Sequence, residues 1–149
     1  MDKKEKIIQL LALIFHENWR ESMLQSNWIY KSRMEKSEDE EWTRKHWTDK
    51  VDIANTKFED LPSNWKYENI KAAEVAVNLV YEKVVKWEKI TSEMIERMSK
   101  IVHEEWLERN WKDWSSENQR LKYEELSEEE KLKDRDQIQI AIQIIESLK

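Results

Sequence analysis

Hydrophobic residues recur at intervals of three and four along four stretches of the chain, and this spacing is typical of the buried face of an α-helix. The first stretch runs from about Lys4 to Met23, with apolar positions at Ile7, Ile8, Leu11, Ile14 and Phe15. The others run from Pro62 to about Val80, from Glu93 to about Arg109, and from Ser127 to Leu148. The pattern predicts a mainly α fold with four main helices.

Local signals support these helix boundaries. Proline is tolerated in the first turn of a helix, so Pro62 marks the start of the second. Thr91-Ser92 supplies an N-cap for the third helix. Ser127 with Glu130 has the spacing of a capping box, which opens the last helix.

The helical period fails between Asn27 and Thr56, and tryptophans become frequent there. The acids of Glu38–Glu41 favour the start of a short helix that ends near His46. Trp28-Ile29-Tyr30 and Val51-Asp52-Ile53 are the only segments that suggest a short β-ribbon. Because disordered linkers are poor in aromatic residues, we expect this connector to fold as a lid or as one wall of a cleft.

The chain repeats itself. Phe58-Glu59-Asp60-Leu61 returns 65 positions later as Tyr123-Glu124-Glu125-Leu126, and the apolar positions of the helices that follow stay in register. His16-Glu17-Asn18-Trp19 returns as His103-Glu104-Glu105-Trp106 at an offset of 87. The drop from 87 to 65 means that the first copy holds 22 extra residues.

These offsets indicate two helix-pair repeats, at about residues 4–87 and 91–149, with the insertion within 20–57. A chain of 149 residues suits one domain, so we expect a single domain over 1–149 whose repeats are related by a pseudo-two-fold axis.

Composition excludes several classes of function. The net charge of −6 argues against nucleic acid as a partner, because phosphate binding requires clustered cations. The absence of cysteine excludes disulfides and thiolate catalysis. The absence of glycine excludes a P-loop, a dinucleotide fingerprint and a nucleophile elbow. No apolar run is long enough for a membrane span, so we expect no membrane contact. We also expect a cytoplasmic chain and no cofactor.

The two His-Glu pairs invite comparison with zinc proteases, in which a second histidine follows four positions after the first. Arg20 and Leu107 stand at those positions, so we expect no metal site. Without a strained turn to present a nucleophile, we also expect no enzymatic activity. The favoured interpretation is that His16 and His103 are hydrogen-bonded inside each repeat and hold the tryptophan and the turn.

Nine tryptophans require an explanation. Trp65 and Trp87 lie near apolar helix faces, and we expect them in the core. Trp19 and Trp106 fit a core role or a binding role equally well. Each lies near an arginine, Arg20 or Arg109, and two facing indoles flanked by guanidinium groups suit a purine and its phosphates.

In these motifs the chain resembles the ryanodine receptor repeat family. Its pattern of His-x-x-Trp, Trp-x-Tyr and Tyr-x-x-Leu followed by Glu-Lys and Asp-Arg is matched in turn by His16 with Trp19, by Trp28 with Tyr30, and by Tyr123, Leu126, Glu130-Lys131 and Asp134-Arg135. The family usually places glycines around Trp-x-Tyr, whereas Asn27 and Lys31 stand here, and Trp111-Lys112-Asp113-Trp114 replaces the element in the second copy.

The resemblance implies a helical tandem repeat without catalytic chemistry, which binds an adenine nucleotide in an aromatic cleft between the repeats. Sequestration of a nucleotide signal such as cyclic ADP-ribose is one specific form of this function. The expected ligand-binding residues are Trp19, Trp106, Trp28, Tyr30, Arg20, Arg109, His16 and His103. The alternative is a protein-interaction or structural domain with no small ligand, and a protein partner or homo-oligomer stays open in either case.

Overall fold

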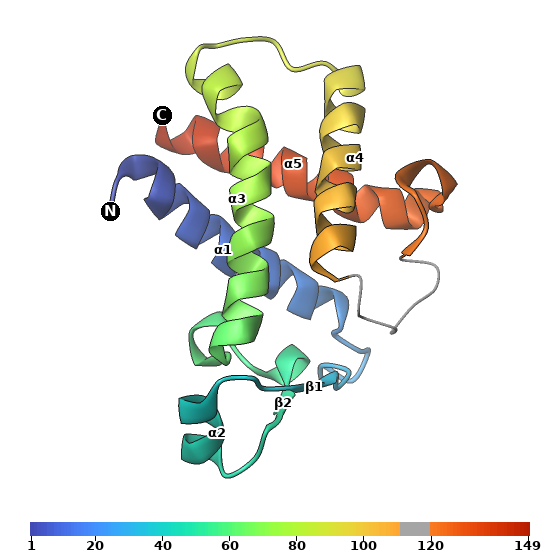
Figure 1. The fold of residues 1–149 in the computed structure, drawn as a ribbon. Helices are drawn as coiled ribbons and strands as arrows, with labels where there is room; N and C mark the ends of the chain where they lie inside the picture. The colour runs from blue at the N-terminus through green and yellow to red at the C-terminus, as the bar shows by residue number, and fades with distance from the viewer. Residues whose placement is uncertain (111–119) are drawn as a thin grey trace. The chain divides into compact units, whose positions relative to one another are not determined.

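A computed structural model describes residues 1–110 and 120–149 (Figure 1). The described part is mainly helical, as the hydrophobic period predicts. In chain order the elements are α1 (Lys3–Ser22), β1 (Met34–Lys36), α2 (Glu40–His46), β2 (Lys50–Asp52), the 3₁₀ turns η1 (Ile53–Asn55) and η2 (Phe58–Asp60), α3 (Ser63–Val85), α4 (Ser92–Arg109), the 3₁₀ turn η4 (Tyr123–Glu125) and α5 (Glu128–Leu148). The Trp111–Trp114 segment lies outside the described residues.

The four long helices begin and end close to the boundaries that the sequence indicates. The Thr91 hydroxyl accepts a hydrogen bond from the Met94 amide at 3.2 Å, so α4 is capped as expected. The Ser127 hydroxyl accepts from the Glu130 amide at 3.2 Å at the start of α5. The Glu130 carboxylate bonds to Lys133 Nζ at 3.0 Å. Of the two hydrogen bonds that define a capping box, the one accepted by the Ser127 hydroxyl is therefore present.

The chain forms two compact units, residues 8–71 and residues 1–7 with 72–149. The division falls inside α1 and α3, so each of these helices contributes to both units.

In the unit of residues 8–71, β1, α2 and β2 together form a small strand–helix–strand element. It lies within the region expected to hold the insertion. Asp39 joins this element to α3, because Oδ1 accepts from the Trp42 amide at 3.1 Å and Oδ2 from the Ser63 amide at 3.0 Å. The Trp42 indole donates to the Asp60 carbonyl at 2.9 Å, and the Trp65 indole donates to the Lys36 carbonyl at 3.0 Å. Whether the element acts as a lid stays a prediction.

The expected β-ribbon is wrong in one of its two strands. β2 contains Val51 and Asp52 as predicted, but its antiparallel partner is Met34–Lys36. Trp28 takes a positive φ of 64°, which turns the chain back so that Tyr30 bridges to Leu24. The Trp28–Tyr30 segment therefore closes a loop on the end of α1 and is not available to β2.

In the other unit, α4 packs against α5, which crosses it in Figure 1. The apolar faces of this unit supply the fully or nearly fully buried side chains Ile7, Ala73, Ala76, Val77, Val80, Val84, Met98, Val102, Ile138, Ala141 and Ile145. No helix among the described residues is both long and apolar enough to cross a bilayer.

The expectation that Trp87 lies in the core is wrong, since 79% of the residue is exposed. α3 ends at Val85, and Trp87 takes a φ of 60° just beyond it. The Trp87 amide bonds to the Val84 carbonyl at 3.1 Å and the Glu88 amide to the Lys83 carbonyl at 2.9 Å, which is the Schellman pattern of helix termination. Trp65, by contrast, is half-buried.

Candidate functional site

His16 organises a local motif at the C-terminal end of α1. Its imidazole is buried, and Nε2 lies 2.7 Å from the Thr56 carbonyl oxygen. A carbonyl can only accept, so Nε2 carries the hydrogen and donates it. The imidazole lies near-parallel to the half-buried Trp19 indole, with centroids 6.0 Å apart and an interplanar angle of 23°, and tilted against Phe58 at 6.4 Å. Burial lowers the pKa of His16.

His103 organises the same kind of motif on α4. Its Nε2 lies 2.6 Å from the Leu121 carbonyl oxygen, and the ring is buried. The Trp106 indole lies near-parallel to it at 6.1 Å and 17°, and Tyr123 is tilted against it at 6.3 Å.

The two motifs also match at positions whose residue types differ, so that the sequence did not show the match. The two accepting carbonyls, Thr56 and Leu121, are 65 positions apart, the same offset as Phe58 and Tyr123. Each motif continues into a 3₁₀ turn, closed by a bond from Leu61 N to Phe58 O at 3.2 Å or from Leu126 N to Tyr123 O at 3.1 Å. Each histidine thus joins its tryptophan to the connector ahead of the turn, as the favoured interpretation expects.

The second motif has an acid that the first lacks. Asp134 Oδ2 lies 3.6 Å from His103 Nδ1, and the Asp134 side chain is 14% exposed. Burial, with the nearby charge of Glu130, raises the pKa of this carboxyl to about 7. In the first copy the matching position is Asn69, whose amide bonds to the Trp65 carbonyl at 3.1 Å.

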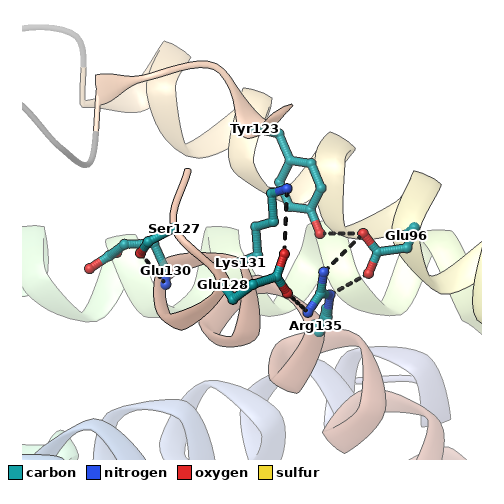
Figure 2. Close-up of polar contacts among 7 residues, drawn as sticks. All are labelled: Glu96, Tyr123, Ser127, Glu128, Glu130, Lys131 and Arg135. Carbon is teal, nitrogen blue, oxygen red and sulfur yellow. Dashed lines mark hydrogen bonds and ion pairs between the residues drawn. The ribbon is translucent and has the colours of Figure 1, made fainter. Parts of the chain in front are cut away.

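A charged network also surrounds the second turn (Figure 2). The Tyr123 hydroxyl donates to Glu96 Oε2 at 2.9 Å. Arg135 contacts both oxygens of Glu96, one of them through Nη2 at 3.2 Å, and donates from Nη1 to Glu128 at 2.9 Å. Burial and the Glu96 hydrogen bond raise the pKa of Tyr123 to about 12, and the hydrogen bond from Arg135 lowers the pKa of Glu96. This network ties η4 to both α4 and α5.

Arg20 contacts three residues of its own unit, residues 8–71. Its Nε donates to the Ala54 carbonyl at 2.9 Å, Nη1 donates to Glu17 at 2.8 Å, and the guanidinium carbon lies 4.7 Å from the centre of the Tyr30 ring. The side chain is 11% exposed. Arg20 and Tyr30 are therefore brought together, and the arginine supports the aromatic connector.

The remaining candidates lie apart from these contacts. Trp28 is 82% exposed at the tip of its loop, and its indole has no ring or hydrogen-bond partner among the described residues. Arg109 is half-buried in the last turn of α4. Within residues 8–71 the structure thus joins His16 with Trp19 and Arg20 with Tyr30, and within the other unit it joins His103 with Trp106.

Neither imidazole is placed to act as a general base through Nε2, because that nitrogen is bonded to a backbone carbonyl and the ring is buried. This counts against an enzyme built on His16 or His103. The sequence interpretation missed Glu96, which contacts both Tyr123 and Arg135. It also missed that Asp134 lies beside His103. The Asp134-Arg135 dipeptide was the available signal, but its partners become adjacent only in the folded chain.

Comparison with models of known protein families, with curated proteins and with solved structures finds no match to this chain.

Proposed function

We propose that this chain is a non-enzymatic module that binds a small molecule derived from an adenine nucleotide, with Trp19 and Trp106 as its stacking surfaces. One observation carries the proposal. Each indole is half-buried and lies near-parallel to a buried imidazole that is itself fixed to a backbone carbonyl. The orientation of both aromatic faces is therefore set before any ligand arrives.

A fixed aromatic face favours binding of a base for two reasons. Stacking of a base on an aromatic side chain contributes roughly 1–3 kcal/mol. A side chain that already holds its bound conformation loses less rotamer freedom on binding.

The proposal assigns a positioning role to both histidines, because their rings are buried and lie near-parallel to the indoles. Arg20 likewise supports Tyr30, and the exposed Trp28 indole is left to contact the ligand. Arg109 is the candidate cation for the phosphates. The proposal retains the two-fold repeat.

Isothermal titration of the full chain with ATP, ADP-ribose and cyclic ADP-ribose tests this function. At least one ligand should bind with one molecule per chain. Trp19→Leu and Trp106→Leu should each weaken binding by about tenfold or more, as the loss of one stacking contact predicts. Trp87→Phe, at an exposed tryptophan, is the matched control and should bind as the unchanged chain does.

Two outcomes overturn the proposal. One is the absence of heat and of any rise in unfolding temperature with all three ligands at millimolar concentration. The other is binding that survives the double Trp19→Leu, Trp106→Leu change. Mass spectrometry of the ligand released by heat distinguishes sequestration, which returns it unchanged, from turnover.

A further inference from the structure

Asp134 is a largely buried carboxyl to which the described residues offer no hydrogen-bond donor. Its side chain is 14% exposed, and within residues 1–110 and 120–149 it accepts no hydrogen bond. The one basic side chain within ion-pair distance of it in that part of the chain is His103, whose Nδ1 lies 3.6 Å from Oδ2. Because a buried carboxylate without a donor is unfavourable, the group favours its neutral form.

The neutral His103 ring cannot supply the missing donor. Nε2 carries the ring hydrogen, because it donates to the Leu121 carbonyl at 2.6 Å. Nδ1 is then an acceptor, and an ionised carboxylate is also only an acceptor. One additional proton resolves this conflict, whether it resides on Oδ2 of Asp134 or on Nδ1 of His103. The geometry therefore favours a pair that holds one proton between two facing acceptor atoms.

The charged groups around Asp134 do not replace that proton. Glu130, one turn earlier on α5, opposes ionisation of Asp134, whereas Lys133 favours it. Lys133 Nζ is itself paired with Glu130 at 3.0 Å. Arg135 is paired with two other glutamates (Figure 2). The titratable groups next to the pair on the other packed elements are His103 and Glu96 of α4 and Tyr123 of η4.

His103 connects this proton to the rest of the second motif. Its ring lies near-parallel to the Trp106 indole and holds the Leu121 carbonyl. Asp134 belongs to α5 and His103 to α4, and these two helices pack against each other. Loss of the proton leaves a negative charge between them. That charge is relieved only if water enters or the two side chains separate, and either change frees the ring that orients Trp106.

The first motif has no such proton. Asn69 occupies the position that matches Asp134, and its amide donates to the Trp65 carbonyl at 3.1 Å. An amide does not titrate, so the neighbour of His16 and Trp19 at this position stays neutral at every pH. The chain thus contains its own reference for the effect of the carboxyl.

We propose that Asp134 is a positioning residue that makes the second motif sensitive to pH. While His103 and Asp134 hold one proton between them, the imidazole keeps the Trp106 indole and the Leu121 carbonyl fixed. When that proton passes to water, the carboxylate faces Nδ1 without a hydrogen between them, and both contacts loosen. The inference concerns the motif itself and holds whether or not Trp106 stacks on a nucleotide, so it stands apart from the proposed function.

Fluorine NMR of the full chain labelled with 5-fluorotryptophan, recorded from pH 6 to pH 9, tests the proposal. Trp106→Phe and Trp19→Phe identify the two signals. The Trp106 signal should shift or broaden in one step near pH 7, because burial with the charge of Glu130 raises the pKa of Asp134 to about 7. The Trp19 signal should show no step there. Far-UV circular dichroism should stay constant, which assigns the change to the motif and not to unfolding.

Asp134→Asn should abolish the step and keep the Trp106 signal at its low-pH position, because the asparagine amide is neutral and can donate towards Nδ1. Asp136→Asn, at an exposed acid of the same helix, is the matched control and should keep the step.

Carbon NMR of the aspartate carboxyls in the unchanged chain gives a second readout that does not depend on a variant. One carboxyl should titrate with the same midpoint as the Trp106 step. The proposal is overturned if Trp106 shows no step, if Trp19 shows the same step, if the step survives in Asp134→Asn, or if no aspartate titrates with it.

Discussion

His103 Nδ1 faces Oδ2 of Asp134 at 3.6 Å, a separation too long for a hydrogen bond. Since Nε2 of the same ring donates to the Leu121 carbonyl, Nδ1 is the nitrogen left to interact with the carboxyl. The matching position in the first copy is the uncharged Asn69. The two motifs thus share a histidine and a tryptophan but differ in the protonation behaviour of the residue beside the ring.

This difference predicts that Asp134→Asn stabilises the chain at neutral and higher pH. The folded pKa of about 7 lies above the ordinary aspartate pKa of 3.8, so the folded chain binds more protons between these values and loses stability as the pH rises through them. The substitution should raise the free energy of unfolding by on the order of 1–3 kcal/mol at pH 8. Urea denaturation from pH 4 to 8 measures it, and the gain should shrink towards pH 4.

The exposed neighbour Asp136 provides the control. Asp136→Asn should change stability little at any pH in this range. A loss of stability in Asp134→Asn at pH 8 would show that the ionised carboxyl is favourable beside His103.

His16 should contribute the opposite dependence on pH. Burial lowers its folded pKa below 6.5, so the folded chain binds fewer protons than the unfolded chain and stability is lost as the pH falls below 6.5. His16→Gln should remove that slope and cost about 1–3 kcal/mol at pH 7, because it disrupts the bond to the buried Thr56 carbonyl. Thermal unfolding at several pH values compares it with the control His46→Gln, which alters an exposed ring. An unchanged slope in His16→Gln would assign the pH dependence to another group.

The Schellman geometry at the end of α3 predicts that Trp87→Gly is stabilising. Relief of the left-handed conformation should gain roughly 1–2 kcal/mol. The lost contact of Lys149 Nζ, 3.2 Å from the ring centroid, should cost about 0.5–1 kcal/mol. Trp87→Ala keeps a Cβ and should be less stable than Trp87→Gly, so urea denaturation of the two variants isolates the backbone effect. Equal stability of the two would show that the cap imposes no strain.

The Glu96 network predicts a modest role for the Tyr123 hydroxyl. Tyr123→Phe reproduces the aromatic residue of the first turn, Phe58, and should cost about 0.5–1.5 kcal/mol, because Glu96 retains Arg135 as a partner. Arg135→Lys should cost more, since a lysine cannot make the two-pronged contact to Glu96. A double-mutant cycle in urea measures the coupling between the two positions. Tyr67→Phe, at an exposed ring, serves as the control, and a cycle with zero coupling would contradict the network.

The helices were predictable because the signals that define them are local. The stripe that contains Leu11 and Phe15, the Thr91 cap and the Ser127 cap each act within a few residues of the sequence. The β-ribbon was only half predictable, because the Trp28–Tyr30 segment turns back to Leu24 and leaves Met34–Lys36 to pair with β2. The positive φ at Trp28 that goes with this turn has no reliable sequence signal. Trp87 shows the same limit, since the positive φ with which it terminates α3 and leaves its side chain exposed has no reliable sequence signal.

The candidate site divides in the same way. The repeated His-x-x-Trp motif and the aromatic turn are visible as offsets in the sequence, and from them the sequence by itself determined that each histidine is associated with a tryptophan and a turn. Only the tertiary structure decided that both imidazoles donate to backbone carbonyls, that Arg20 is engaged by Ala54 and Glu17, and that Asp134 is buried beside His103. The physical reason is that hydrogen bonding, burial and protonation depend on partners between 18 and 40 positions away in the chain for the histidine and Arg20–Ala54 contacts, and these partners become neighbours only when the helices pack.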